Sequence, residues 1–345
     1  MARASRALDW TFVPVWYSNC KSDSRHRPPP PGRGPKTPNH SCLAKRAHAA
    51  DGAHSSSDAG SGVTMALVQM SMGELLANLQ TKFGKDFSNY RLSCIQRRVA
   101  LRMSSLKLAT LDDYMAYLTG NPREIEQLLD TVTIHVTEFF RDAEVFDAVA
   151  KDILPAIVSR KLHSPSRTIR VWSAGCSTGE EAYSLAILVL RHLRSNGIDL
   201  ALEVYGTDVS KEACAAAREG AYAARKVEGV PGEIRRKYFE AKGPEYRVVP
   251  DVRRCVKFSI HDLFSPSPFS LLDLVVCRNV LIHFDHAVRN DVLKRFHAAL
   301  GDQGLLILGK SEAVMGSALA CYELIDPRNK IYRKSSSATP EGGRR

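Results

Sequence analysis

The stretch IRVWSAGCSTGEEAYSLAILVL, residues 169–190, decides the fold class because it begins as a β-strand and ends as a helix. Its first positions are rich in β-branched and aromatic residues, and its last positions are rich in Ala and Leu. Gly175 and Gly179 lie at the junction, where glycine lets the backbone turn tightly and lets a ligand approach. This pattern predicts a strand-to-helix turn in a parallel α/β sheet, where ligands bind at the carboxyl ends of the strands.

The turn AGCSTGEE, residues 174–181, lacks the features of a phosphate-binding loop. No Lys-Ser/Thr pair follows Gly179, and the spacing of the two glycines does not fit G-x-G-x-x-G. A helix N-terminus normally attracts an anion, but here Glu180 and Glu181 already occupy it. We therefore expect a neutral or cationic ligand.

The next acidic residue narrows the ligand further. Asp208 closes the predicted strand LEVYGTD, where such domains place the carboxylate that holds ribose hydroxyls. A nucleoside with a positive centre in place of a pyrophosphate is S-adenosylmethionine. The residues therefore favour a methyltransferase, with a dinucleotide-dependent dehydrogenase as the alternative.

Strand and helix patterns alternate through residues 131–334, which predicts a doubly wound sheet with helices on both faces. The segment YELIDPRNKIYRK, residues 322–334, predicts two strands joined by a turn at an antiparallel edge. Residues 72–130 instead contain short amphipathic helices and predict a small all-α domain. One of these helices carries arginines without matching acids on the same helix, which indicates a docking surface for an acidic partner: Arg91, Arg97, Arg98 and Arg102.

The two ends of the chain have a different composition. Residues 1–64 are rich in Pro, Gly and Ser and hold nine Lys and Arg against four Asp, a net +5 of the chain's +11. We expect this segment to be disordered and Met65 to be the true start, with a functional basic arm as the alternative. Deleting 1–64 should then leave activity and stability unchanged. Residues 335–345 are also expected to form a disordered tail.

Composition also limits the class of protein. No apolar run approaches the ~18 residues of a membrane helix, so we expect no membrane insertion and a cytoplasmic location. The eight cysteines contain no C-x-x-C pair and are expected to be free thiols. His283 and His286 flank Asp285 without a convincing ligand pattern, so no metal site is predicted.

Six motifs occur in the order and spacing of a known family. They are TVTIHVTEFFRD (131–142), VWSAGCSTGEEAYSLA (171–186), YGTDVS (205–210), IHDLF (260–264), VVCRNVLIHFD (275–285) and LILGKSEA (306–313). Together they resemble the CheR-type chemotaxis receptor protein-glutamate methyltransferases over residues 72–334. The resemblance implies a Rossmann-like S-adenosylmethionine-dependent methyltransferase domain with a small β-subdomain insertion at about 235–258, preceded by the all-α domain.

The same resemblance implies a reaction and a set of site residues. The reaction is O-methylation of glutamate side chains on acidic chemoreceptor helices by a protein expected to be a monomer. Arg141 is implied to lie beside the methyl-transfer site as the catalytic residue, and Glu180 to face the amino group of the cofactor's methionine part. Where the family usually has Asn, this chain has His135, whose ring can supply one donor and one acceptor. The other implied cofactor contacts are Thr137, Asp208, Asp262, Leu263, Asn279 and Val280.

Ionisation of the substrate explains why the sequence shows no triad or metalloprotease motif. A glutamate carboxylate has an ordinary pKa near ~4.3, so it needs no general base at neutral pH. Two alternatives remain at this stage: a sensor that binds the cofactor without catalysis, and a nucleic-acid methyltransferase that uses the basic charge. The sensor is not favoured, because the chain keeps the implied site residues except for the Asn that His135 replaces. The nucleic-acid methyltransferase is not favoured, because the sequence has no [ND]-P-P-[YFW] motif for holding a flipped base.

One feature bears on how the substrate docks. The turn EAKGPEY, residues 240–246, is short for a loop that grips a receptor's C-terminal peptide. We therefore predict docking through the basic helix, by Arg97, Arg98 and Arg102, without dependence on a receptor tail.

Overall fold

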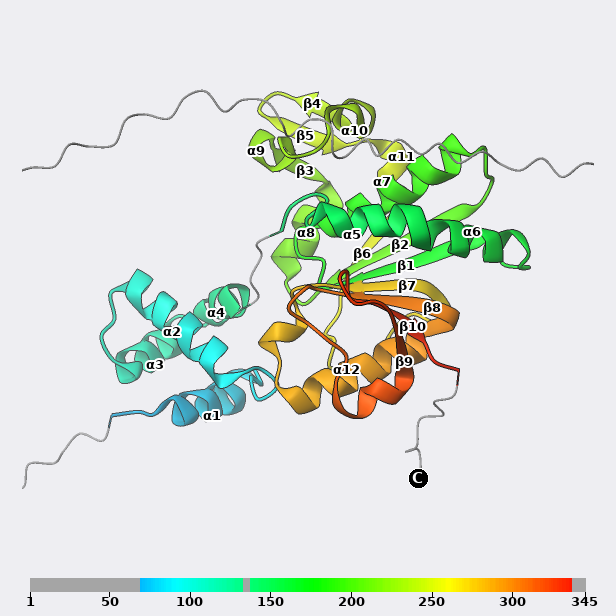
Figure 1. Ribbon diagram of the computed structural model, residues 1–345. Coiled ribbons are helices and arrows are strands. Elements are labelled where there is room, and N and C mark those ends of the chain that lie inside the picture. The colour runs from blue at the N-terminus through cyan, green and yellow to red at the C-terminus, as the bar shows by residue number, and fades with distance from the viewer. Residues whose placement is uncertain (1–68, 133–136, 337–345) are drawn as a thin grey trace, which may run out of the picture. The chain divides into compact units, whose positions relative to one another are not determined.

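The structure is a computed structural model that describes residues 69–132 and 137–336 (Figure 1). The expectations for residues 1–64, for His135 and for residues 337–345 of the predicted C-terminal tail lie outside the described residues. Ser335, the first residue of that tail, donates a backbone hydrogen bond to Cys321 at 2.9 Å. Within the part that is described, no helix is both long and apolar enough to cross a membrane.

The first described region is the predicted all-α domain. Side chains of Ser71 and Thr110 close capping boxes with the third residues of their helices, which fixes where these helices begin. The apolar faces meet in one core, in which Leu79, Ile95 and Leu128 are fully buried. The helices are α1 (Met72–Phe83), α2 (Leu92–Leu106), α3 (Leu111–Gly120) and α4 (Glu124–Val132).

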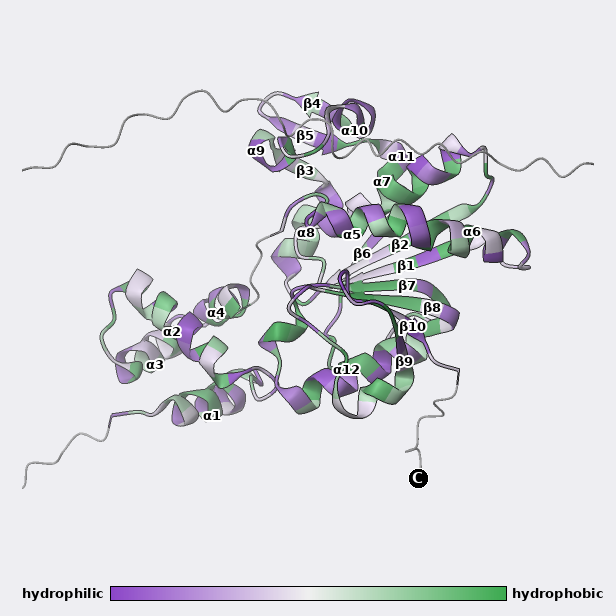
Figure 2. Ribbon diagram, viewed as in Figure 1, coloured by the Kyte–Doolittle hydropathy of each residue, from purple (hydrophilic) through white to green (hydrophobic). Residues whose placement is uncertain are grey.

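A seven-stranded sheet forms the centre of the second region, in the order β6-β2-β1-β7-β8-β10-β9. The first five strands of that order are parallel, and β10 is antiparallel to both of its neighbours, as the sequence predicted for this end of the chain. Figure 2 shows hydrophobic residues concentrated along β7 and β8, and all six residues of β7 are buried. The strands are β1 (Thr168–Ala174), β2 (Ala201–Asp208), β6 (Val256–Ile260), β7 (Leu272–Cys277), β8 (Leu300–Leu308), β9 (Tyr322–Asp326) and β10 (Ile331–Lys334).

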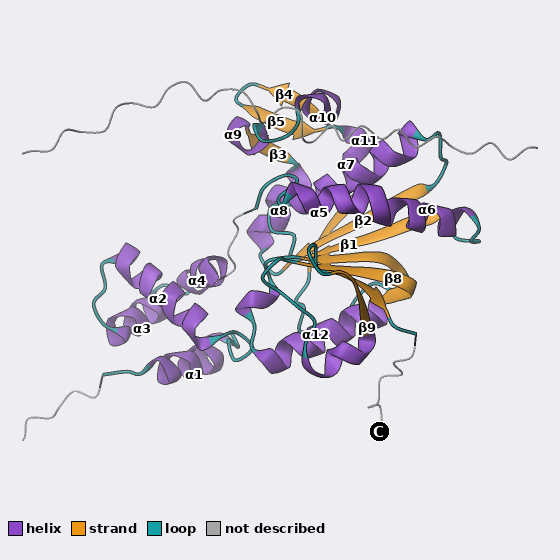
Figure 3. Ribbon diagram, in the orientation of Figure 1, coloured by secondary structure: helices purple, strands orange, loops and turns teal. Residues whose placement is uncertain are grey.

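Helices cover both faces of this sheet, which confirms the doubly wound prediction. Figure 3 shows α6 and α7 on one face and α12 on the other. Trp172 of β1 packs on the α12 face, with its ring centroid 5.3 Å from that of Phe296. The elements are α5 (Ala143–Ala148), the π-helical turn η1 (Val149–Ile153), α6 (Leu154–Leu162), α7 (Glu180–Ser195), α8 (Lys211–Glu219), α11 (Pro250–Arg253), α12 (His286–Ala299), and the 3-10 turns η2 (Leu281–His283) and η3 (Gly316–Cys321).

A separate three-stranded antiparallel sheet follows α8 and forms the β-subdomain. It contains β3 (Ala221–Ala223), β4 (Phe239–Lys242) and β5 (Glu245–Val248), with α9 (Ala224–Val227) and α10 (Gly232–Tyr238) between the first two strands. The predicted range of 235–258 is therefore wrong at both ends. It omits β3, which is too short to show a strand pattern, and it includes the start of β6, which belongs to the large sheet.

The order of the large sheet reverses between β1 and β7. The chain runs from β1 outward to β2 and β6, then returns to the other side of β1 with β7. Loops after these parallel strands therefore diverge and leave room for a ligand at their carboxyl ends.

Candidate cofactor-binding site

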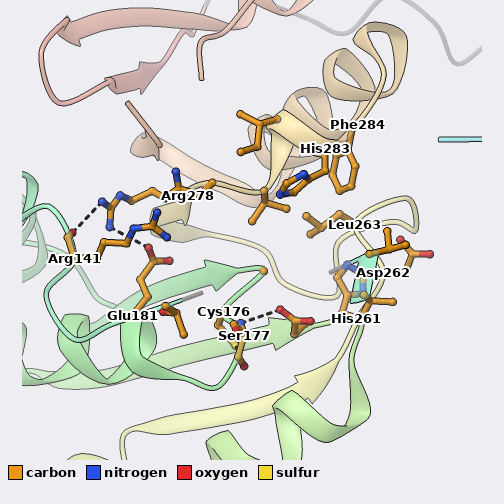
Figure 4. A pocket seen from close by; sticks show the side chains of 18 of the residues that line it. Arg141, Cys176, Ser177, Glu181, His261, Asp262, Leu263, Arg278, His283 and Phe284 are labelled. Carbon is orange, nitrogen blue, oxygen red and sulfur yellow. Dashed lines mark hydrogen bonds and ion pairs between the residues drawn. The ribbon is translucent and has the colours of Figure 1, made fainter. Parts of the chain in front are cut away.

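A cavity of about 230 Å³ opens at this switch point (Figure 4). Its walls come from the loops after β1, β2, β6 and β7, from residues that precede α5, and from Tyr90 and Val132 of the all-α domain. Figure 4 shows two unlike ends: Arg141, Glu181 and Arg278 form a charged end, and His261, Asp262 and Leu263 lie apart from them.

The backbone at the cavity is held in sparsely populated conformations. Gly175 has a φ of +75°, and a Cβ atom there would lie 2.5 Å from a methyl carbon of Val280, so the loops after β1 and β7 approach too closely for a side chain. Ser177 and Asn279, with φ of 50° and 61°, also adopt the left-handed region. Such strain persists where the surrounding structure fixes it, and it clusters at ligand sites.

Asp208 ties the ends of β1 and β2 together. Its carboxylate accepts hydrogen bonds from the backbone N–H of Ser177 at 2.8 Å and from that of Ser210 at 3.1 Å. The side chain is buried but still lines the cavity. Asp208 therefore shapes the loop AGCSTGEE and also presents a carboxylate to a ligand.

The end of β6 supplies a second carboxylate and an unpartnered ring nitrogen. Asp262 accepts a hydrogen bond from the backbone N–H of Phe264 at 2.9 Å, which fixes the turn that carries Leu263. His261 has a buried Nε2 atom without a hydrogen-bond partner among the described residues. Burial lowers the pKa of His261 from its ordinary value, so the neutral ring is favoured. This end of the cavity thus offers polar groups that a ligand can satisfy.

The loop after β7 depends on Glu312. Its carboxylate accepts hydrogen bonds from the backbone N–H groups of Asn279, Val280 and Ile282 at 2.9–3.2 Å, and from that of Gly309 at 2.6 Å. Glu312 lies in the motif LILGKSEA, but the sequence reading gave it no role. It positions the two cavity residues Asn279 and Val280.

Arg278 organises the charged end of the cavity. Its guanidinium donates to the backbone oxygen of Arg141 at 2.9 Å, to the Glu181 carboxylate at 3.3 Å, and to the carboxylate of Asp142. Its side chain is almost fully buried. Burial raises the pKa of Glu181, an effect that Arg278 opposes. Arg278 therefore fixes the segment that presents Arg141.

The structure brings most of the predicted site residues to one cavity. No role was predicted for Tyr90, His261, Arg278 or Glu312, although the last three lie inside the quoted motifs. The predicted residues that line the cavity are Thr137, Arg141, Asp208, Asp262, Leu263, Asn279 and Val280.

Glu180 is not among the cavity residues, which corrects the expectation that it faces the ligand. Successive side chains of a helix point in different directions, and here the first residue of α7 contacts Lys226 of the β-subdomain whereas the second, Glu181, lines the cavity. The Glu180 carboxylate is fully buried and pairs with Lys226 at 2.9 Å.

The predicted docking surface on α2 also changes. Arg102 donates twice, at 2.7 Å, to the buried carboxylate of Glu124 on α4, which in turn accepts from the hydroxyl of Tyr114. No acid on α2 itself pairs with Arg102, but this acid on another helix does, so Arg102 does not belong to the predicted docking surface. Arg97 is exposed and Arg98 partly exposed on the same helix.

The cavity residues fit S-adenosylmethionine. Two carboxylates and an unpartnered imidazole nitrogen suit the hydroxyls and ring of a nucleoside. At the other end, the Glu181 carboxylate suits the amino group of the cofactor's methionine part. Gly175 and Val280, in close contact, line the cavity as well.

Comparison with known proteins assigns both regions. The description "CheR methyltransferase, SAM binding domain" matches residues 135–327, and "CheR methyltransferase, all-alpha domain" matches residues 71–133. A chemotaxis protein methyltransferase of Borreliella burgdorferi is 30% identical over 71% of this chain and 89% of its own length. One from Listeria innocua is 31% identical over 73% of this chain and 92% of its own.

A further relative is much longer than this chain. An uncharacterized 104.1 kDa protein of Rhodobacter capsulatus is 32% identical over 76% of this chain, which spans 27% of that protein's length. The two family descriptions together cover both the helical region and the cavity of this chain. The chain described here therefore belongs to the CheR family of S-adenosylmethionine-dependent methyltransferases.

Proposed function

We propose that this protein methylates glutamate side chains on the cytoplasmic helices of chemoreceptors. The observation that carries the proposal is the meeting of Thr137, Arg141, Asp208, Asp262 and Asn279, from separate segments, around one cavity. These are the positions at which the family resemblance implies cofactor and methyl-transfer contacts.

Each end of the cavity has a distinct role in this proposal. Asp208 holds the ribose hydroxyls, and Asp262 and Leu263 line the adenine part. Glu181, in place of the expected Glu180, receives the amino group. When bound, the cofactor supplies an electrophilic methyl group on a positively charged sulfur.

The chain's own task in this reaction is to align the substrate carboxylate with the methyl group of the cofactor. A carboxylate oxygen of the substrate forms a bond to the methyl carbon while the carbon–sulfur bond breaks, and its electron pair stays on sulfur. No proton moves, because glutamate is already ionised at neutral pH. Arg141 orients the substrate carboxylate, and such positioning can supply about 7–11 kcal/mol of a barrier.

Docking of the receptor rests on α2. Arg97 and Arg98 present positive charge to acidic receptor helices, whereas Arg102 is engaged with Glu124. The connection between β4 and β5 is the tight turn Gly243–Pro244, without a protruding loop. We therefore propose that methylation does not depend on a receptor tail peptide.

The test is transfer from cofactor labelled in its methyl group to receptor-containing membranes, with DNA as the alternative acceptor. We expect base-labile label on the receptor, since a methyl ester hydrolyses in alkali, and equal labelling after the receptor's C-terminal tail is removed. Label on DNA instead of the receptor, or cofactor binding without transfer to either, would contradict the proposal.

Arg141→Ala tests the catalytic residue. Arg141 lies at the charged end of the cavity, away from the proposed nucleoside end, so we expect measurable cofactor affinity with transfer reduced by orders of magnitude. Calorimetry and label transfer measure the two effects separately. Unchanged transfer would leave Arg141 with a structural role only.

A further inference from the structure

Glu180 is a buried carboxylate that the proposed reaction does not use. Its side chain has no exposed surface, and its two oxygens are engaged by the Lys226 ammonium at 2.9 Å and by the Thr178 hydroxyl at 2.7 Å. A buried carboxylate is costly unless it is paired and hydrogen-bonded. Lys226 therefore decides whether the first turn of α7 can hold its position.

Lys226 also reaches the cavity segment. Its ammonium donates a second hydrogen bond, at 2.8 Å, to the backbone oxygen of Thr137. Thr137 lines the cavity four residues before Arg141. One side chain thus connects the start of α7, next to the cavity residue Glu181, with the segment that leads to the proposed catalytic arginine.

The residue that makes these contacts belongs to the β-subdomain. Lys226 lies on α9, directly after β3. Tyr222 of β3 makes a second connection, because its hydroxyl donates to the backbone oxygen of Thr178 at 2.7 Å. The Tyr222 ring packs edge-on against Phe139, with centroids 4.8 Å apart, and Phe139 packs in turn against Phe239 of β4.

These contacts place the β-subdomain behind two walls of the cavity at once. Phe139 lies between Thr137 and Arg141, so its aromatic contacts hold the same segment that Lys226 holds by its backbone. Thr178 belongs to the loop AGCSTGEE, so Tyr222 supports the loop after β1.

We propose that Lys226 is a positioning residue for cofactor binding, and that through it the β-subdomain is a supporting part of the cofactor site. The inference rests on the proposed function, since the cavity is taken to hold S-adenosylmethionine. Removing the ammonium frees the Thr137 carbonyl and leaves Glu180 without its cation, and both changes loosen the cavity wall.

The test compares three lysine variants of the full chain. Lys226→Met keeps the length of the side chain without its charge, Lys226→Arg keeps the charge, and Lys242→Met changes an exposed lysine at the end of β4. Calorimetry measures the affinity for S-adenosylhomocysteine, and steady-state kinetics measure KM for the cofactor and kcat.

We expect Lys226→Met to weaken the affinity at least tenfold and to raise KM for the cofactor more than it lowers kcat. Lys226→Arg should recover most of the affinity, and Lys242→Met should match the wild type. A lower melting temperature in Lys226→Met with unchanged affinity and KM would overturn the inference.

A double variant separates positioning from stability. Lys226→Met/Glu180→Gln removes the uncompensated charge, so its melting temperature should return towards that of the wild type. Its affinity should stay weaker, because the Thr137 carbonyl still lacks its donor. Wild-type affinity in the double variant would show that Lys226 acts on stability alone and would overturn the inference.

Hydrogen exchange on the wild type tests the inference without any substitution. Binding of S-adenosylhomocysteine should slow exchange of backbone amides in β3 and β5 as well as at residues 137–142, and absence of this protection in the β-subdomain would contradict the coupling. A wild type that does not bind the compound would overturn the proposed function and the inference with it. Binding by the wild type that Lys226→Met retains in full would overturn the inference alone.

Discussion

The cavity wall and the arginines of α2 differ in how their side chains are held. At the wall, carboxylates bind backbone N–H groups: the cavity residue Asp208 accepts from two, and Glu312, which supports the lining residues Asn279 and Val280, accepts from four. On α2, Arg97 is exposed, whereas Arg102, one and a half turns along the same helix, is locked to Glu124. The residues at the strand ends reach the cavity because of the order of strands and loops. Whether an arginine on α2 is exposed or paired depends instead on whether another helix supplies an acidic partner.

The largest expected effect is at Asp208. Asp208→Ala removes a ligand carboxylate and both backbone hydrogen bonds that order the loop after β1, so we expect cofactor affinity to fall at least 100-fold, about 3 kcal/mol. Calorimetry with S-adenosylhomocysteine measures this, with the exposed Asp302→Ala as the control. Equal affinity in both variants would show that Asp208 does not contribute to the site. It would also contradict the view that carboxylates bound to backbone N–H groups hold the cavity wall.

The order of the motifs made much of this wall predictable. Asp208 ends a strand of the sheet, Asp262 and Asn279 each come two residues after one, and parallel strands bring their carboxyl ends to one edge. The doubly wound sheet and the antiparallel edge were predictable for the same reason, since apolar runs and turn residues report on local structure.

Neighbouring side chains with different partners were not predictable. Glu180 and Glu181 are adjacent, yet one is buried against Lys226 and the other lines the cavity. The partner of Glu180 is a lysine 46 residues further along the chain, which a local pattern does not contain. The Arg102–Glu124 pair and the role of Glu312 were not predictable for the same reason, because each depends on a contact between residues distant in sequence.

Arg102 should give the next largest effect, and on stability only. Arg102→Met leaves the Glu124 carboxylate, which is 5% exposed, without its cation. Breaking a buried pair costs about 3–5 kcal/mol, and because Arg102 is 20% exposed we expect about 2 kcal/mol of lost unfolding free energy.

Chemical denaturation of Arg102→Met and Arg97→Met distinguishes the two kinds of arginine. Arg97→Met should stay within about 0.5 kcal/mol of the wild type, because surface substitutions usually do. If the two variants lost the same free energy of unfolding, the pairing with Glu124 would not make Arg102 more important for stability than the exposed Arg97.

The charge reversal Arg97→Glu/Arg98→Glu should act on docking instead. Exposed charge pairs are each worth about 0–1 kcal/mol and are screened by salt, so we expect KM for the receptor to rise about tenfold at low salt and much less at 0.5 M. Cofactor affinity should be unchanged, since neither residue lines the cavity. Methylation kinetics at two salt concentrations measure this, and a salt-independent effect would argue against electrostatic docking.

The smallest expected effect lies where the two regions meet, at His283. Its ring lines the cavity, and its backbone oxygen accepts from the N–H of Arg91 at the start of α2. Burial lowers the pKa of His283, and the nearby Arg98, Arg91 and Arg289 lower it further. As pH falls below about 6.5, the ordinary pKa of histidine, the unfolded chain takes up a proton that the folded protein does not bind, so stability decreases. The loss continues until pH passes the lowered pKa of the folded state.

His283→Gln should therefore reduce the stability lost between pH 7.5 and 5.5, while the exposed His286→Gln should not. Part of the loss should remain, because burial also lowers the pKa of His192, His261 and His297. Denaturant midpoints at the two pH values measure the difference. The charge reversal that includes Arg98→Glu should act in the same direction, since a carboxylate in place of that arginine favours the protonated ring. If His283→Gln kept the full pH dependence, the imidazole would have the same pKa in the folded and unfolded protein, and the positive charge of α2 would not reach the cavity.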